Sequence, residues 1–340
     1  MKTIGVLTAG GDCPGLNAAI RGIVARAVAG GAEVVGVEDG WSGLIEGRTR
    51  PLSRASVRGI IYRGGTILGT SRVDPYVHGE GLASLRPTLE ATGIEGLIVM
   101  GGDGSLRTAA RLHNEGLKVI GVPKTVDNDI GGTDTSFGFD TAVQIVTDAL
   151  DRLTTTAEAH NRIMVVEVMG RHSGWIALHA GLAAGAEAVL IPEVPYDLDQ
   201  LTTRLRTRHE AGSDYSIVVV AEGVADPTGQ QVMAGTDQFG FARYGGVAVS
   251  IAQELERKTG YESRVMILGH LQRGGTPTAF DRVLATRMGV KAAELALAGT
   301  SGVMVAVQGT EMVAVDLATA CAEPRSVPAS LCEISGWFTV

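Results

Sequence analysis

Residues 96–112 read GLIVMGGDGSLRTAARL, and this stretch decides the fold class. It begins with an apolar run, passes through the four residues GGDG and continues from residue 105 with a helical pattern. Strands buried on both faces of a parallel sheet are unbroken apolar runs, and glycines allow a tight turn directly into a helix. The stretch therefore predicts a β-strand that leads through a glycine turn into an α-helix.

The same alternation recurs along the chain. Further apolar runs lie at 3–7, 33–37, 119–122, 163–168, 188–191, 216–221 and 264–268. Helical patterns lie at 16–29, 105–114, 140–155, 174–183, 198–210, 247–258 and 278–298. Alternating strands and helices indicate a doubly wound α/β fold, in which ligands bind beyond the carboxyl ends of the strands.

Composition narrows the class of protein further. A chain of 340 residues is expected to form about two domains at ~150 residues per domain. The net charge of −8 gives no overall positive field for nucleic acid or an anionic membrane. The three cysteines lack metal-ligand spacing, and no apolar run reaches the ~18 residues of a membrane span. We expect free thiols, a cytoplasmic location, and neither a nucleic-acid nor a membrane partner.

Two strand ends carry glycine-rich turns. TAGGDCPGLNAAIR (8–21) follows the first strand, and GGDG (101–104) follows the strand at 96–100. Glycine turns before a helix bring backbone N–H groups close to an anion. The alternative is a tight strand-to-helix turn without a ligand, which would have the same sequence pattern. Asp103 fits a phosphate site only if a hard cation such as Mg²⁺ accompanies the phosphate; its alternative role is a helix cap. Neither turn has the spacing of a dinucleotide-binding or P-loop motif.

A third strand end reads VIGVPKTVDNDIGG (119–132). Pro123 ends the strand, and Asp127 and Asp129 follow two residues apart. In extended backbone both carboxylates project to the same side, which suits one as a base and the other as its support. The alternative is an ordinary loop rich in Pro, Asn, Asp and Gly.

Basic residues flank two further strands and one glycine-rich loop: Arg162, Arg264, His270 and Arg273, and Arg63 and Arg72 in YRGGTILGTSR (62–72). Arginine binds phosphate in a bidentate manner, so arginines at strand ends would make a local anion site in an acidic protein. Glycine turns, an aspartate for Mg²⁺, an aspartate as base and arginines together indicate phosphoryl transfer. An NAD-binding dehydrogenase is the weakest alternative because its glycine fingerprint is absent.

The chain resembles the 6-phosphofructokinase family. GGDCPGLNAAIRG, RGGTILGTSR, GGDGS, PKTVDND, SFGFDTA, VVEVMGRHSGW, LGHLQRGGTP and DRVLATRMG occur in family order over residues 5 to about 290. The resemblance implies two doubly wound, Rossmann-like three-layer α/β domains with the active site in the cleft between them. It places 1–138 plus about 252–305 in a larger donor-binding domain, and 139–251 plus about 306–340 in a smaller sugar-phosphate-binding domain.

The resemblance also implies a role for each site residue. Asp127 is the general base toward the 1-hydroxyl of fructose 6-phosphate, with Asp129 in support, and Asp103 holds Mg²⁺. The charge of the transferred group is stabilised by Gly11, Arg72, Thr125 and Arg171, and the donor is held by Gly11, Arg72, Val73, Gly102, Asp103, Gly104 and Ser105. The sugar phosphate is held by Met169, Gly170, Glu222, His270 and Arg273, together with Thr125, Asp127 and Arg171. Arg162 and Arg264 are implied to come from a neighbouring subunit of a tetramer or dimer with shared active sites.

Two positions implied to separate phosphoryl donors disagree. Gly104 resembles the ATP-dependent enzymes, because aspartate there would repel the nucleotide's α-phosphate, whereas Lys124 resembles the pyrophosphate-dependent enzymes. The absence of a side chain at Gly104 leaves room for the nucleotide, so this position favours ATP as the donor. Thr108 argues against ATP, because the resemblance implies a smaller residue there in the ATP-dependent enzymes. Pyrophosphate as donor, another acceptor such as sedoheptulose 7-phosphate, and a silent nucleotide-binding regulatory subunit remain the alternatives.

The effector pocket of the bacterial family is only partly present. Arg21, Arg54 and Glu187 match it, but Thr154, Ala211 and Ser213 stand where family members carry cations. Fewer cations bind an anionic effector more weakly. The sequence therefore predicts little response to phosphoenolpyruvate or ADP.

Overall fold

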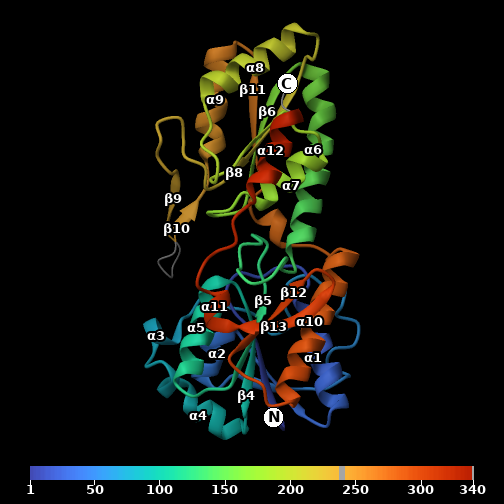
Figure 1. The fold of residues 1–340 in the computed structure, drawn as a ribbon, viewed down its shortest axis with the longest axis vertical. Coiled ribbons are helices and arrows are strands. Elements are labelled where there is room, and N and C mark those ends of the chain that lie inside the picture. The colour runs from blue at the N-terminus through green and yellow to red at the C-terminus, as the bar shows by residue number, and fades with distance from the viewer. Residues whose placement is uncertain (237–241, 339–340) are drawn as a thin grey trace. The chain divides into compact units, whose positions relative to one another are not determined.

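The structure is a computed structural model that describes residues 1–236 and 242–338. The chain forms two compact units. Unit 1 comprises Met1–Thr141 and Arg273–Arg325, and unit 2 comprises Ala142–Gln272 and Ser326–Val340. Each unit has its own β-sheet with helices packed on it, so the predicted α/β class is confirmed (Figure 1).

Unit 1 is built on a 7-stranded sheet of order β13-β12-β5-β4-β1-β2-β3. The strands are β1 (Thr3–Thr8), β2 (Glu33–Val37), β3 (Thr49–Leu52), β4 (Gly96–Gly101), β5 (Val119–Pro123), β12 (Val303–Gln308) and β13 (Glu311–Asp316). All neighbours pair in parallel except the edge strands β3 and β13. The chain goes from β1 to β2 on one side and later to β4 on the other, which makes β1–β4 a topological switch point.

Helices cover both faces of this sheet. They are α1 (Leu16–Ala29), α2 (Gly40–Glu46), α3 (Pro75–His78), α4 (Leu82–Thr92), α5 (Asp103–Asn114), α10 (Ala279–Leu297) and α11 (Leu317–Ala320). One apolar core buries residues of α2, α4, α5 and α11 against the strands, and α1 packs on α10 at the other face (Figure 1). A Cβ on Gly289 would lie 2.3 Å from the carbonyl oxygen of Ala19, so only glycine allows α1 and α10 to pack this closely.

Unit 2 is built on a 4-stranded parallel sheet of order β11-β6-β8-β7. Its strands are β6 (Ile163–Val168), β7 (Ala188–Leu190), β8 (Ser216–Ala221) and β11 (Ser263–Ile267), with a separate hairpin of β9 (Met233–Thr236) and β10 (Ala242–Tyr244). The helices are α6 (Phe139–His160), α7 (Trp175–Ala183), α8 (Leu198–Glu210), α9 (Val247–Thr259) and α12 (Ala329–Phe338), and η1 (Gly269–Arg273) is a 3-10 turn. Helix α9 packs on β6 and β11, and α7 packs on β7 and β8.

The predicted strands and helices are all present, but one strand differs in burial. β11 was expected to be buried, whereas the side chains of Met266 and Ile267 are 40% and 48% exposed. The reason is its place at the edge of the sheet, where only β6 pairs with it. The strands β3, β9, β10, β12 and β13 and the helices α2, α3, α4, α11 and α12 were not predicted.

The domain bounds expected from the resemblance differ from the two units in three places, and the shortest of these is 139–141, which belong to unit 1. β11 pairs with β6, so residues 252–272 lie in unit 2 rather than in the larger domain. β12 pairs with β5 and β13 with β12, so 306–325 lie in unit 1 rather than in the smaller domain. The expected ranges also include 237–241 and 339–340, which lie outside the described residues.

In the part of the chain that the structure describes, no disulfide joins the three cysteines Cys13, Cys321 and Cys332. Within the described residues, no helix combines the length and the apolar character needed to cross a bilayer.

Candidate functional site

The glycine turns of unit 1 begin at the carboxyl ends of neighbouring parallel strands. In the parallel ladders Thr8 pairs with Met100, and Gly101 pairs with Pro123, so β1, β4 and β5 end side by side. The loops that follow these strands contain most of the predicted donor residues. The candidate site of unit 1 therefore lies at the carboxyl ends of these strands, next to the topological switch point.

Backbone contacts hold these loops together. Gly10 has φ of +80°, and its N–H donates to the carbonyl oxygen of Ser71 at 2.9 Å. A Cβ on Gly10 would lie 3.4 Å from Oγ of Ser105. The structure thus brings together Gly11, the segment of Arg72 and Val73, and the start of α5 with Gly102 and Ser105. Small residues at these crossings leave backbone N–H groups accessible to an anion.

Lys124 lies within this cluster and is almost fully buried, with 3% of its surface exposed. Its ammonium donates a hydrogen bond to the carbonyl oxygen of Gly11. Burial lowers the pKa of Lys124 to about 8. Arg273 lies beside it, since its Nη1 donates to the carbonyl oxygen of Asp12 at 3.1 Å. Two cations therefore flank the first glycine turn and supply the positive charge that a phosphate site needs.

The loop after β5 places Thr125 and Asp127 in contact. The N–H of Asp127 donates to Oγ1 of Thr125 at 3.1 Å, and this hydroxyl lies 3.3 Å from Oδ2 of Asp127. Both residues are buried, with 7% and 5% exposed. A carboxylate held in this way, out of bulk water, is suited to accept a proton from a hydroxyl placed next to it.

Asn128 has a structural function that the sequence did not reveal. It has a left-handed backbone with φ of +54°, which asparagine tolerates better than most residues. Its Oδ1 accepts a hydrogen bond from the N–H of Ser136 at 3.0 Å, and the Ser136 hydroxyl donates to the carbonyl oxygen of Thr125 at 2.9 Å. Asn128 therefore closes the loop that carries Asp127.

The chain beyond residue 310, for which the sequence assigned no role, supports the same loop. The N–H of Arg325 donates to the carbonyl oxygen of Asp129 at 2.8 Å. A Cβ on Gly131 would lie 2.6 Å from the carbonyl oxygen of Glu323. No local pattern reports a contact over this distance along the chain, so the sequence could not have predicted it.

At the start of α5, Asp103 and Gly104 differ in their surroundings. Asp103 is paired with Arg107, whose Nε lies 2.9 and 3.0 Å from its two carboxylate oxygens. A Cβ on Gly104 would meet nothing within 4 Å, so this position is open. One turn further along α5, the Thr108 hydroxyl donates to Oδ2 of Asp74 at 2.8 Å.

A metal site formed by protein side chains alone is not present in the described part of the chain. No three His, Cys, Asp or Glu side chains gather there closely enough to hold an ion. Mg²⁺ in phosphoryl-transfer sites is held by one or two carboxylates and by the phosphates of the substrate. Asp103 and the glycine turns fit that kind of site.

In unit 2, the predicted sugar residues lie where β6 and β8 end. Gly170 and Arg171 have φ of +152° and +51°, so the turn after β6 is tight. The N–H of Arg171 donates to Oε1 of Glu222 at 3.1 Å. Because a Cβ on Gly223 would lie 1.7 Å from the carbonyl oxygen of Arg171, no other residue fits beside this turn.

Arg162 and Arg264 lie at the opposite end of the same sheet. Arg162 precedes β6, whereas Met169 follows it; at ~3.3 Å per residue, the strand separates them by about 20 Å. Nε of Arg162 lies 2.6 Å from Oε2 of Glu262, and Arg264 pairs with the other oxygen of that carboxylate. Within one chain, the structure therefore does not bring these two arginines to Met169, Arg171 and Glu222.

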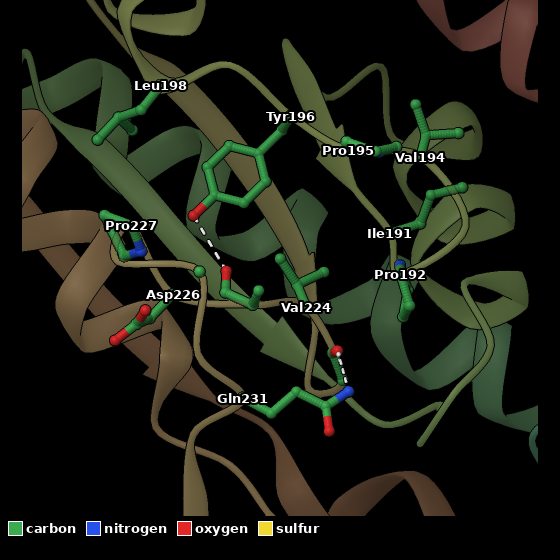
Figure 2. A pocket seen from close by; sticks show the side chains of 13 residues that line it. Ile191, Pro192, Val194, Pro195, Tyr196, Leu198, Val224, Asp226, Pro227 and Gln231 are labelled. Carbon is green, nitrogen blue, oxygen red and sulfur yellow. Dashed lines mark hydrogen bonds between the residues drawn. The ribbon is translucent and has the colours of Figure 1, made fainter.

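A pocket of about 430 Å³ lies in unit 2 between the segment that follows β7 and the segment that follows β8 (Figure 2). Its walls are largely apolar and include Pro192, Tyr196 and Val224, with the Tyr196 hydroxyl donating to the carbonyl oxygen of Ala225 at 3.1 Å. None of the predicted site residues lines it. No arginine, lysine or histidine is among the described residues that line it, which is unlike a sugar-phosphate site.

The fold and the loops of unit 1 define a doubly wound α/β protein with a candidate anion site at the carboxyl ends of β1, β4 and β5. A family model described as Phosphofructokinase matches residues 3–296. The chain belongs to the phosphofructokinase family, as its motifs predicted.

Relatives of both donor types are similar to this chain. ATP-dependent 6-phosphofructokinase 3 of Streptomyces coelicolor is 52% identical over 328 residues, which cover 96% of each chain. Pyrophosphate–fructose 6-phosphate 1-phosphotransferase of Amycolatopsis methanolica is 51% identical over 329 residues, again covering 96% of each. Overall similarity therefore does not separate the donors.

The fold agrees with solved structures of the family. The T-state structure of Pichia pastoris phosphofructokinase is 31% identical, with a TM-score of 0.84 over 99% of this chain and 36% of the other. The present chain thus spans about a third of that longer protein. The predicted pair of Rossmann-like α/β domains is confirmed.

Proposed function

We propose that this chain transfers a phosphoryl group from ATP to the 1-hydroxyl of fructose 6-phosphate and forms fructose 1,6-bisphosphate, a glycolytic reaction. The observation that carries the proposal is the buried pair of Thr125 and Asp127 beside the glycine turns of unit 1. Membership of the phosphofructokinase family supports the acceptor and the reaction type. A silent regulatory subunit would have no chemical need for this pair.

In the proposed reaction, Asp127 accepts the proton of the 1-hydroxyl as the sugar oxygen attacks the γ-phosphorus. The bond to ADP breaks as the new phosphorus–oxygen bond forms. Asp129 supports the base, while the Gly11 backbone, Arg72, Thr125 and Arg171 stabilise the charge on the transferred group. Mg²⁺ held by Asp103 would neutralise the donor phosphates.

Gly104 supports ATP as the donor, because the open space around it leaves room for the α-phosphate. Lys124 is the observation in favour of pyrophosphate, since its ammonium lies at the first glycine turn. Initial rates of the purified protein with fructose 6-phosphate and either donor test the proposal. Faster turnover with pyrophosphate would replace ATP by the alternative donor, and sedoheptulose 7-phosphate as competitor would test the acceptor.

We further propose a homo-oligomer, a tetramer or a dimer, with shared active sites. The separation of Arg162 and Arg264 from Met169 along β6 supports this arrangement. The exposed apolar side chains of Met266 and Ile267 in the edge strand β11, and of Leu271 in the η1 turn that follows it, support a subunit contact there. Cysteines that form no disulfide fit the cytoplasm, which is the location we propose for this enzyme.

A further inference from the structure

Unit 2 holds a fully buried polar side chain that none of the predicted roles includes. Gln272 lies in η1, two residues after His270, and its exposed fraction is 0%. A buried amide without hydrogen-bond partners would destabilise the fold. Its partners therefore show what this glutamine does.

Each end of the Gln272 amide has one backbone partner. Oε1 accepts a hydrogen bond from the N–H of Met169 at 3.1 Å, and Nε2 donates to the carbonyl oxygen of Gly269 at 3.0 Å. Met169 begins the turn after β6, and Gly269 begins η1. One side chain thus joins the turn of Met169, Gly170 and Arg171 to the turn of His270.

The two hydrogen bonds of Gln272 lie just beyond the end of the ladder between β6 and β11. The paired residues of β11 and β6 end at Ile267 and Glu167, and the next backbone contact runs from the N–H of Leu268 to the carbonyl oxygen of Glu167 at 3.1 Å. Beyond that point, the two turns leave the sheet. Gln272 therefore sets their spacing after the ladder hydrogen bonds have ended.

The chemistry of the two partners explains why the residue is glutamine. One partner is a donor and the other an acceptor, and a carboxamide offers both functions on one side chain. A glutamate carboxylate could accept from Met169 but would repel the Gly269 carbonyl. Methionine would leave both backbone groups without this partner, and asparagine is shorter by one methylene group.

We propose that Gln272 is a positioning residue for the acceptor sugar phosphate. It fixes the turn of Met169, Gly170 and Arg171 relative to His270, and the contact of Arg171 with Glu222 fixes the same turn from the other side. The inference rests on the proposed function, because it uses the sugar-binding roles of these residues. A small displacement of substrate-positioning groups lowers the rate of the reaction strongly.

Gln272→Met tests this role with Gln200→Met, an exposed position on α8 of the same unit, as the matched control. In Gln272→Met, kcat/KM for fructose 6-phosphate is expected to fall roughly 10- to 100-fold. KM for ATP, measured at saturating sugar phosphate, is expected to stay within about twofold, because the hydrogen bonds of Gln272 go to Met169 and Gly269 and to no donor residue. If this variant fails to fold, Gln272→Asn remains polar and is expected to shift kinetics in the same direction.

Hydrogen exchange gives a readout that does not depend on turnover. The amide of Met169 is expected to exchange faster in Gln272→Met than in the wild type, with no change in the control. An unchanged kcat/KM for fructose 6-phosphate, or an equal loss toward both substrates, overturns the positioning role. A wild-type chain without activity on fructose 6-phosphate would instead refute the proposed function, before any variant is made.

Discussion

The ammonium of Lys124 donates a hydrogen bond to the carbonyl oxygen of Gly11, which joins the loop after β5 to the turn after β1. The residue that favours pyrophosphate by resemblance thus has a contact within the protein itself. Its positive charge still lies at the first glycine turn, where phosphates of either donor would bind. Lys124 therefore bears on donor affinity as well as on donor choice.

The charge of Lys124 is expected to titrate near neutral pH. Burial lowers its pKa to about 8, so the ammonium loses its proton as the pH rises through that value. We expect KM for the donor to rise between pH 7 and pH 9 in the wild type, and this rise to be absent in Lys124→Met. The same KM profile in both proteins would show that another group titrates.

The lowered pKa of Lys124 also makes its effect on the stability of the fold depend on pH. The pKa of Lys124 is lower in the folded protein than its ordinary value of 10.5, so the unfolded chain binds more protons between pH 8 and 10.5. The destabilising contribution of this lysine is thus largest below pH 8 and fades as the pH rises. Denaturant unfolding at pH 7 and pH 10 should show it as a difference between the wild type and Lys124→Met that shrinks with pH.

Gly104→Asp is expected to lower kcat/KM for ATP by more than ~10-fold, a loss of over about 1.4 kcal/mol. The added carboxylate would repel the α-phosphate. Gly104→Ala is the control, because a Cβ at this position meets no atom within 4 Å. Unchanged ATP kinetics in the aspartate variant would place the nucleotide elsewhere.

Asp127→Asn removes the proposed base and retains the size of the side chain. We expect kcat to fall by roughly 10²- to 10⁴-fold, the usual contribution of general-base catalysis. Asp134→Asn is a control on the same loop, since Asp134 contacts the N–H of Gly309 rather than Thr125. Near-normal turnover of Asp127→Asn would refute its role.

Asn128 offers a test of the loop itself. In Asn128→Ala, the left-handed backbone costs about 1–2 kcal/mol, and the lost hydrogen bond to Ser136 adds about 1 kcal/mol. Asn128→Gly loses only the hydrogen bond at this φ, so it should be less destabilised. Urea unfolding of the two variants measures both contributions, and equal losses would contradict the backbone argument.

The sequence predicted most elements from local patterns and missed contacts between residues far apart in the chain. β4 and β5 are unbroken apolar runs because both faces of each strand are buried. β12 and β13 were not predicted, although each contains a short apolar run. The contacts of Arg325 with the Asp129 loop and of Gln272 with Met169 join residues far apart in the chain, which no periodicity reports.

The site residues show the same division. The glycine turns and Asp127 could be located because each follows an apolar strand directly. The resemblance implied that Arg162 and Arg264 act on a neighbouring subunit. The structure adds a physical reason for this proposal, since the length of β6 keeps them from Met169 within one chain.

That separation leads to a test by subunit complementation. Asp127→Asn lacks the proposed base but retains Arg162, and Arg162→Ala retains the base but lacks the arginine. If sites are shared, mixed oligomers contain some sites with Asp127 from one variant and Arg162 from the other. Activity should then appear on mixing and reassembly of two proteins that are nearly inactive alone.

Mixing Asp127→Asn with Asp127→Asn/Arg162→Ala is the control, because no site in that mixture carries the base. No recovery, despite oligomers mixed in equal amounts, would mean that Arg162 serves its own chain, and the proposal of shared sites would fail.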